Sequence, residues 1–150
     1  MTDILCNEEI KKTFMIPDFE NRQKAETAFF RLKDFCHADD HFMYGIYLNG
    51  TLIGFLNDCK IEDNTMEIGY VIHPDYRGNG YAPEALDAAI KELFRIGYAR
   101  VIASFFVENP ASRRVMEKCG MHKIDIESDD EYQGKIHHCL YFAIDNPAFV

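Results

Sequence analysis

Hydrophobic and polar residues recur with two different periods along this chain, and the changes of period divide it into helices and strands. Between residues 19 and 37 the apolar positions are three and four apart, which is typical of one face of an amphipathic helix. Residues 42–48 and 51–59 have the pattern of strands, and Asn49-Gly50 lies between them. Because Asn-Gly provides both positive φ angles of a type I′ turn, a β-hairpin is predicted here.

A third strand and a long helix follow the hairpin. Residues 62–64 form a polar turn, and residues 65–72 form a further apolar strand, so a three-stranded antiparallel meander is predicted. Pro83 suits the first position of a helix, where no N–H is needed, and Gly97 ends that helix. The predicted buried stripe of this helix is Leu86, Ile90, Leu93 and Phe94.

The last third of the chain alternates between strand and helix patterns. Residues 101–107 are continuously rich in β-forming residues and predict a strand parallel to residues 65–72, because a helix intervenes. Asn109 caps a helix that begins at Pro110 and ends at Gly120. Residues 121–126 and 136–144 predict two final strands, joined by a polar loop at residues 127–135.

The first residues carry weaker signals. Residues 1–6 are interpreted as a short first strand, and Asn7 as the cap of a helix that Pro17 stops. With 150 residues, no repeat and no linker, the chain predicts a single α/β domain, 1–150, in which a mixed and mostly antiparallel sheet is flanked by helices.

Charge and cysteine content narrow the class of function. A formal charge of −9 argues against a nucleic-acid partner, which would need a basic face, and fits a cationic substrate better. Five scattered cysteines without a CxxC pair indicate neither a disulfide framework nor a zinc site. His37 and His41 are not expected to bind a metal, because Asp39-Asp40 marks a helix end between them. The longest apolar run is too short to span a membrane, so a cytoplasmic protein without a membrane partner is expected.

The stretch from Tyr76 to Ala82 is the most informative in the chain. Two glycines precede a helix start, so several backbone N–H groups point toward one place at the positive end of the helix dipole, which is suited to an anion. A Walker loop is excluded because no lysine follows Gly80. A dinucleotide fingerprint is excluded because Pro83 occupies the position of its third glycine. The spacing that remains is Arg77, Gly80 and Ala82.

This spacing resembles the pyrophosphate loop of the GNAT superfamily of acetyl-coenzyme A dependent N-acetyltransferases. The segments Glu67-Ile68-Gly69-Tyr70 and Asn109-Pro110-Ala111-Ser112 are similar to the branch that acetylates ribosomal-protein N-termini. The resemblance implies a GNAT fold with splayed central parallel strands. It also implies transfer of an acetyl group from acetyl-CoA to a primary amine, on a protein N-terminus or a small molecule, by direct attack.

The resemblance also implies which residues hold the cofactor. The main chain of Val71 and Ile72 would pair with the pantetheine arm, and an N–H near Val71 would stabilise the oxyanion. Asn109 can cap its helix, hydrogen-bond the pantetheine arm, or do both. The diphosphate would bind the backbone amides of Arg77, Gly78, Asn79, Gly80, Tyr81 and Ala82.

Candidate catalytic residues follow from the chemistry of amine acetylation. An amine with a pKa of about 10.4 must lose a proton before attack, and Glu67 is the candidate base, with Glu108 and His73 as rivals. Glu67 can instead only bind the cationic amine. Where many relatives have a thiolate-protonating tyrosine this chain has Met116, so Ser112 is the candidate donor; it can equally be a first-turn serine that only satisfies the backbone.

Other interpretations stay open at this point. Arg113, Arg114 and Lys118 add positive charge near the loop, and one of them is a candidate for the 3′-phosphate of the cofactor. A non-catalytic coenzyme A sensor or scaffold is the alternative function, and a generic mononucleotide binder is a third. Residues 18–40 and 127–135 are expected to build the acceptor pocket. Exposed strand edges make a homodimer possible.

Overall fold

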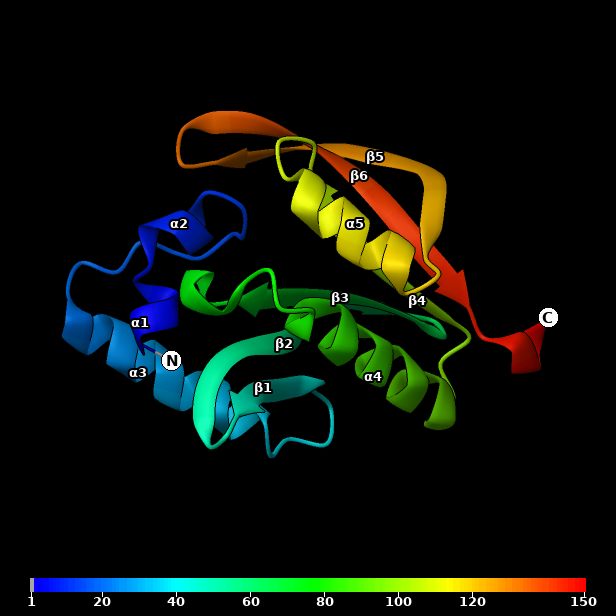
Figure 1. The fold of residues 1–150 in the computed structure, drawn as a ribbon, viewed down its shortest axis with the longest axis horizontal. Coiled ribbons are helices and arrows are strands. Elements are labelled where there is room, and N and C mark those ends of the chain that lie inside the picture. Colours follow the sequence, from blue (N-terminus) through cyan, green and yellow to red (C-terminus); the bar gives the residue numbers. More distant parts are fainter. Residues whose placement is uncertain (1) are drawn as a thin grey trace.

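A six-stranded sheet runs through the molecule and carries helices on both faces (Figure 1). The structure is a computed structural model that describes residues 2–150. The strands are β1 (Met43–Leu48), β2 (Thr51–Glu62), β3 (Thr65–Ile72), β4 (Arg100–Phe106), β5 (His122–Tyr132) and β6 (Lys135–Asp145). The helices are α1 (Thr2–Leu5), α2 (Glu8–Lys11), α3 (Arg22–Phe35), α4 (Tyr81–Arg95) and α5 (Pro110–Lys118), with short 3-10 helices at Pro74–Tyr76 and Pro147–Phe149.

The strand order confirms the predicted mixed sheet. It is β1-β2-β3-β4-β6-β5, and every neighbouring pair is antiparallel except β3 and β4. In the described chain, β3 and β4 pair only from Thr65 opposite Arg100 to Glu67 opposite Ile102. Beyond Glu67 the two strands separate, so the central parallel strands are splayed, as the family resemblance implied.

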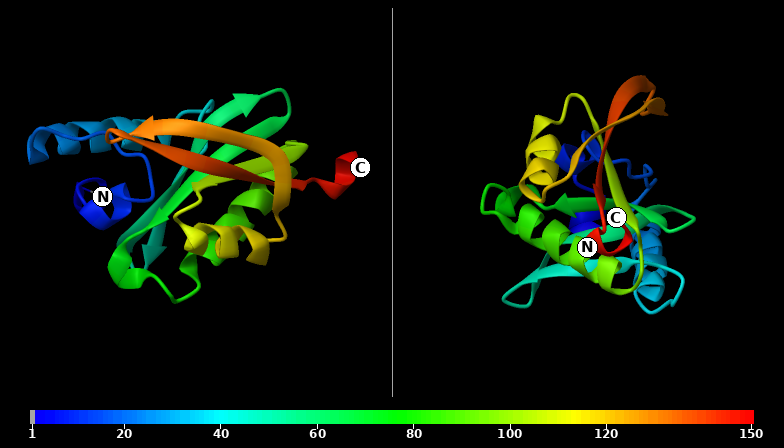
Figure 2. Two further views of the ribbon diagram at one scale, coloured as in Figure 1. Left: turned by 90° about the horizontal axis from the view of Figure 1, so that it is seen from above. Right: turned by 90° about the vertical axis from the view of Figure 1, so that its right-hand side faces the viewer.

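Each face of the sheet has its own core. Met66 and Ile68 point to the face covered by α4 and α5, where they pack with Leu86 and Met116. Val71 points to the opposite face. There it packs with Ile4, Ile10, Met43, Phe55 and other residues of α1, α2 and the first two strands. Figure 2 shows the two helical layers on either side of the sheet.

Most helix and turn signals act as predicted. The side chains of Asn7 and Asn109 cap α2 and α5, and the hairpin turn has positive φ at Asn49 and Gly50. The predicted start of the long helix is wrong, because α4 begins at Tyr81 and Pro83 is its third residue. Proline is tolerated there because none of the first four N–H groups of a helix has an intrahelical partner.

The N-terminal prediction of a strand is also wrong. Residues 2–5 form α1, while Met1 lies outside the described residues. Ile4 and Leu5 are only 2% and 3% exposed, so adjacent apolar residues are buried as a helix turn allows, whereas a strand would point one of them outward. The next helix, α2, has only four residues and ends well before Pro17.

The predicted polar loop at residues 127–135 is wrong too. β5 continues to Tyr132, β6 starts at Lys135, and Gln133 and Gly134 make a tight turn with φ angles of 51° and 71°. Residues 127–135 are polar because they lie where the hairpin extends past the rest of the sheet. In their β5 part, every second residue is acidic and faces solvent. Its tip reaches the N-terminal segment (Figure 2), where the Ile16 N–H donates to the Tyr132 hydroxyl at 3.2 Å.

None of the helices in residues 2–150 has the length and apolar character needed to cross a membrane.

Gly54 allows β2 and β3 to approach closely, because a Cβ added there would lie 2.1 Å from the carbonyl oxygen of Val71. We expect Gly54→Ala to lower the free energy of unfolding by roughly 3 kcal/mol, because the backbone must move. Gly50→Ala, at a turn glycine with open space around it, serves as the control and costs about 1–2 kcal/mol through its positive φ. Urea denaturation of both variants measures the difference, and equal losses would contradict this account of Gly54.

Candidate functional site

The loop before α4 is shaped by two glycines in the left-handed region. Gly78 and Gly80 have φ angles of 79° and 85°, and Gly80 is the N-cap of α4 without a side chain to cap it. An L-residue with a Cβ is strained in this region, whereas glycine adopts it freely. The 15-residue helix therefore begins with its first N–H groups uncapped at the positive end of its dipole.

Five consecutive backbone amides of this loop are available to a ligand. The N–H groups of residues 78–82 donate to no acceptor within residues 2–150. The Arg77 amide, which was also predicted to bind the diphosphate, is already used, because it donates to the Pro74 carbonyl at 3.1 Å. The cradle is thus formed by residues 78–82, and Arg77 belongs to its support.

The side chains of Arg77 and Asn79 hold the loop in shape. Arg77 Nε donates to the carbonyl of Ile72, the last residue of β3, at 3.0 Å. Asn79 Nδ2 donates to the carbonyls of Tyr76 and Arg77 at 3.2 and 3.1 Å. These bonds hold the glycine loop against the end of β3. The position of the loop amides relative to the unpaired edge of β3 is therefore fixed.

The direction of the β3 backbone groups corrects one prediction. The His73 N–H donates to the Ile53 carbonyl, which makes Ile72 and Gly54 a non-hydrogen-bonded pair of the β2–β3 ladder. The N–H and C=O of Val71 therefore face β2. Those of Ile72 and, by alternation, Tyr70 face the gap between β3 and β4. The Val71 amide is therefore not available to an oxyanion, whereas the Ile72 amide faces the gap.

A cavity of about 370 Å³ extends from the cradle into this gap. It brings together most of the predicted cofactor-binding residues, together with Tyr70, Ser104 and Phe14. The predicted residues that line it are Val71, Ile72, Arg77, Gly78, Gly80, Tyr81, Ala82, Asn109 and Ser112. Glu67 and Asn79 are not among the lining residues.

Asn109 lines the cavity, and only the oxygen of its side-chain amide is hydrogen-bonded in the part of the chain that the structure describes. Its Oδ1 accepts the Ser112 N–H at 3.3 Å, which confirms the predicted helix cap. Its Nδ2 donates to no group within residues 2–150, so the cap leaves a donor beside the gap. The cap role and a ligand role are therefore compatible.

A pair of hydroxyl groups lies across the gap. Tyr70 Oη is 2.8 Å from Ser112 Oγ and 3.1 Å from the Ser112 carbonyl oxygen. Burial raises the pKa of Tyr70 well above its ordinary value. In the sequence, Tyr70 stands out only as part of the segment Glu67-Ile68-Gly69-Tyr70. Strand alternation from Met66 and Ile68 indicates that Tyr70 faces α5, but no sequence signal identifies the contact with Ser112.

Glu67 lies on the opposite face of the sheet from α4 and α5. Its Oε1 accepts the Ser104 hydroxyl at 2.8 Å. Ser104 lies opposite Tyr141 in the β4–β6 ladder, and Ser128 hydrogen-bonds both Tyr141 and Asp130, so Glu67 and Asp130 lie around this phenol. Burial raises the pKa of Tyr141, and the two carboxylates add to the rise. The two faces of the sheet thus separate Glu67 from the Tyr70–Ser112 pair, with the gap between β3 and β4 connecting them.

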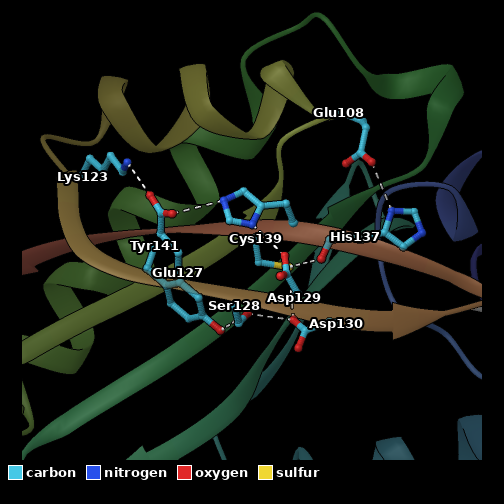
Figure 3. Close-up of polar contacts among 10 residues, drawn as sticks. Glu108, Lys123, Glu127, Ser128, Asp129, Asp130, His137, Cys139 and Tyr141 are labelled. Atoms are coloured by element: carbon cyan, nitrogen blue, oxygen red, sulfur yellow. Dashed lines mark hydrogen bonds and ion pairs between the residues drawn. The ribbon is translucent and has the colours of Figure 1, made fainter.

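The inner face of the β5–β6 hairpin carries further polar side chains, among them Ser128, Asp130 and Tyr141 (Figure 3). The hydroxyls of Tyr141 and Ser128 are 3.1 Å apart, and Ser128 donates to Asp130 at 3.1 Å. Cys139 Sγ donates to the same carboxylate at 3.1 Å. The Asp130 carboxylate therefore has only neutral hydrogen-bond donors as partners within residues 2–150.

The rival candidates for the base have other contacts. His73 Nδ1 accepts the Asp75 N–H at 3.3 Å, so His73 acts as a turn residue. Glu108 is largely exposed, and its Oε1 lies 3.5 Å from Nδ1 of His137 (Figure 3). Within residues 2–150, no three histidine, cysteine, aspartate or glutamate side chains cluster as a metal site would require.

Two cations of α5 face the cavity. Arg113 pairs with Glu117 at 2.8 Å, whereas Arg114 and Lys118 line the cavity and have no ion-pair partner within residues 2–150. They lie one helical turn apart, so both charges are on the same side of α5. The cavity therefore combines free amides, unpaired strand groups and positive charge, which suits an extended anionic ligand.

Comparison with known proteins identifies the class. Residues 1–122 match the acetyltransferase (GNAT) domain family, and the chain belongs to that family. YnaD, an uncharacterized N-acetyltransferase of Bacillus subtilis (strain 168), is 42% identical over 74 residues, which are 48% of this chain and 44% of YnaD. YoaA of the same organism, also an uncharacterized N-acetyltransferase, is 26% identical over 132 residues, 85% of this chain and 75% of YoaA. The match spans less than half the length of YnaD.

Solved structures confirm the GNAT fold. A GNAT-family acetyltransferase from Bacillus anthracis superposes with a TM-score of 0.81 at 25% identity, over 97% of this chain and 87% of that one. The ribosomal L7/L12 α-N-protein acetyltransferase RimL, in complex with coenzyme A, gives 0.76 at 21% identity, with 85% and 75% covered. Spermidine N-acetyltransferase from Vibrio cholerae, in complex with coenzyme A and spermine, gives 0.80 at 18% identity, with 99% and 89% covered. Acetyl-CoA is the donor that this family uses.

The outer face of the hairpin gives a testable pH effect. His138 Nδ1 lies 2.8 Å from Asp129 and its Nε2 lies 3.2 Å from Glu127. Figure 3 shows that Glu127 also pairs with Lys123. The hydrogen bond to Asp129, helped by Glu127, raises the pKa of His138. A raised folded pKa stabilises the protein below the unfolded pKa of about 6.5, and this contribution is lost as the pH rises through the folded value.

We therefore expect Asp129→Asn to lower the pKa of His138 in an NMR titration. The variant should reduce the stability of the protein more at about pH 5.5 than at about pH 8.5, because the contribution of His138 is lost as the pH rises through its folded pKa. An equal loss at the two pH values would show that Asp129 stabilises the hairpin without the charge of His138.

Proposed function

We propose that this protein transfers an acetyl group from acetyl-CoA to a primary amine by direct attack. The observation that carries the proposal is the set of five free amides at residues 78–82, placed beside the open edge of a splayed strand. An anion held at the helix start and an extended arm along the strand would fill both features. Membership of the GNAT family supports the same assignment.

The residues of the cavity fit coenzyme A along its length. The amides of residues 78–82 would bind the diphosphate, and Arg114 or Lys118 would meet the 3′-phosphate. The main-chain groups of Tyr70, with Nδ2 of Asn109, would hold the pantetheine arm. The bound cofactor supplies a reactive acetyl thioester.

Glu67 is proposed as the base that receives the proton of the attacking amine, directly or through water. The amine would approach from the α1–α3 face of the sheet, because Glu67, Ser104 and Tyr141 lie on that face. The Ser104 hydroxyl keeps the Glu67 carboxylate in a defined orientation. The Ile72 amide would donate to the acetyl oxygen, and Ser112 would donate to the sulfur.

The acceptor is proposed to be a protein N-terminus or a small amine. The neighbours in the fold include an enzyme of each kind, RimL and a spermidine N-acetyltransferase. In this chain the acceptor side contains the carboxylates of Glu67 and Asp130, which reach Tyr141 through Ser104 and Ser128, and this favours a cationic acceptor. Its pocket would lie between the β5–β6 hairpin and the N-terminal segment.

The deciding experiment is a thiol-release assay with acetyl-CoA and a panel of acceptors. The panel contains peptides with free N-termini, the same peptides with blocked N-termini, linear diamines and uncharged amines. Turnover with at least one free amine and loss of turnover on blocking it support the proposal. Tight coenzyme A binding without turnover on any acceptor would instead favour a non-catalytic coenzyme A sensor.

Gly80→Ala tests the cradle. At a φ of 85° alanine carries a strain of about 1–2 kcal/mol, which the loop can relieve only by turning its amides. We expect the affinity for coenzyme A, measured by isothermal titration calorimetry, to fall at least about tenfold. Gly50→Ala has a nearly equal φ of 82° on the β1–β2 turn and should leave the affinity unchanged. Equal affinities for both variants would argue that the phosphates bind elsewhere.

Glu67→Gln tests the base. The substitution keeps the size of the side chain but removes the proton acceptor, so we expect kcat to fall by roughly 100-fold or more with little change in coenzyme A affinity. Glu92→Gln, on the far half of α4, is the control. An effect of Glu67→Gln on the KM of the amine alone would mean that Glu67 only binds the cation.

A further inference from the structure

Tyr70 lies on β3, and its phenol points across the gap toward α5. It lies on the part of β3 that has parted from β4, and its ring packs against the core beneath α4 and α5. Its hydroxyl is the only polar atom of the side chain, and both of its contacts within residues 2–150 are to Ser112. The side chain therefore ends at the residue already proposed to donate to sulfur.

The two hydroxyls have two possible hydrogen-bond arrangements. If Tyr70 donates to the Ser112 carbonyl, the Ser112 hydroxyl can donate to Tyr70, and neither proton points into the cavity. If Tyr70 donates to Ser112 Oγ at 2.8 Å, the Ser112 proton is free to point into the cavity. The second arrangement leaves the Ser112 proton no acceptor at Tyr70, so it favours donation to a ligand atom in the gap.

We propose that Tyr70 is a positioning residue that donates to Ser112 Oγ and so directs the Ser112 hydroxyl toward the sulfur of the cofactor. This inference rests on the proposed function. In the transfer, the nitrogen of the neutral amine, whose first proton has gone to water, bonds to the acetyl carbon. The carbon–sulfur bond breaks with its electron pair going to sulfur, and Glu67 takes the proton that the nitrogen loses as the amide forms. Ser112, supported by Tyr70, donates a hydrogen bond to the negative sulfur.

The pKa values of a thiol and of tyrosine indicate that Tyr70 and Ser112 donate a hydrogen bond to the sulfur without transferring a proton to it. A thiol has an ordinary pKa of about 8.5 and tyrosine one of about 10, so a thiolate is the weaker base. Burial raises the pKa of Tyr70 further. Transfer of the Tyr70 proton through Ser112 to sulfur is therefore uphill, while a hydrogen bond to the charged sulfur is favourable. The sulfur receives its proton from solvent after the reaction.

The pKa of the coenzyme A thiol in its complex with the protein tests this inference without turnover. Ultraviolet absorbance of the thiolate, followed against pH at saturating coenzyme A, gives this pKa. Because the hydroxyl pair stabilises the thiolate, we expect Tyr70→Phe and Ser112→Ala each to raise it by about one unit, a tenfold change in the ionisation constant. Tyr98→Phe is the control, because Tyr98 packs against the same core and its hydroxyl bonds to none of residues 2–150.

A double-mutant cycle on kcat supplies the second readout. If Tyr70 acts through Ser112, Tyr70→Phe lowers kcat about tenfold in the native protein and has no further effect in the Ser112→Ala background. The KM of acetyl-CoA should change little in either single variant. Thermal denaturation of each variant shows whether a loss of kcat reflects a loss of fold.

The outcomes separate this inference from the proposed function. An unchanged thiol pKa in Tyr70→Phe, or equal losses of kcat in the two backgrounds, would overturn the role of Tyr70 while leaving acetyl transfer intact. Failure of coenzyme A to bind the native protein would overturn the proposed function itself.

Discussion

The separation of β3 and β4 after Glu67 is the constraint on which the site depends. A parallel pair that stayed in register would use the backbone groups of Tyr70 and Ile72 for sheet hydrogen bonds. Because the strands separate, these groups face a gap, and backbone polar groups inside a protein need a partner. An extended ligand can hydrogen-bond to the backbone groups of β3 that β4 no longer reaches. The glycine loop lies at the end of the same strand, tied to it by the Arg77 bond to the Ile72 carbonyl, so one edge presents both features.

The sheet also divides the chemistry between its two faces. Alternation along β3 sends Tyr70 toward α5 and Glu67 toward the N-terminal helices, although they are three residues apart. A hydrogen-bond donor for the leaving group and an acceptor for the amine proton are thereby kept apart, with the gap between them. The long β5–β6 hairpin extends the acceptor face, and its tip is fastened to residues 14–16 through Tyr132.

Signals that act within a few residues predict the structure correctly. Asn49-Gly50 makes its turn, Asn7 and Asn109 cap their helices, and β3 has the predicted bounds, because each of these features depends on local backbone preferences. The errors came from segments whose state depends on distant partners. Residues 2–5 form a helix over a second core, and the acidic hairpin continues as strands because β5 and β6 pair with each other.

The sequence by itself determined the family resemblance, the mixed sheet and the glycine cradle, since spacing, alternation and turn chemistry are written in neighbouring residues. Tertiary structure alone decided which backbone amides are free, because hydrogen bonding to Pro74 and to β2 removes those of Arg77 and Val71. It also decided that Tyr70 meets Ser112, 42 residues away in sequence. A contact of this kind depends on how a strand and a helix pack across a gap, and no local pattern encodes that geometry.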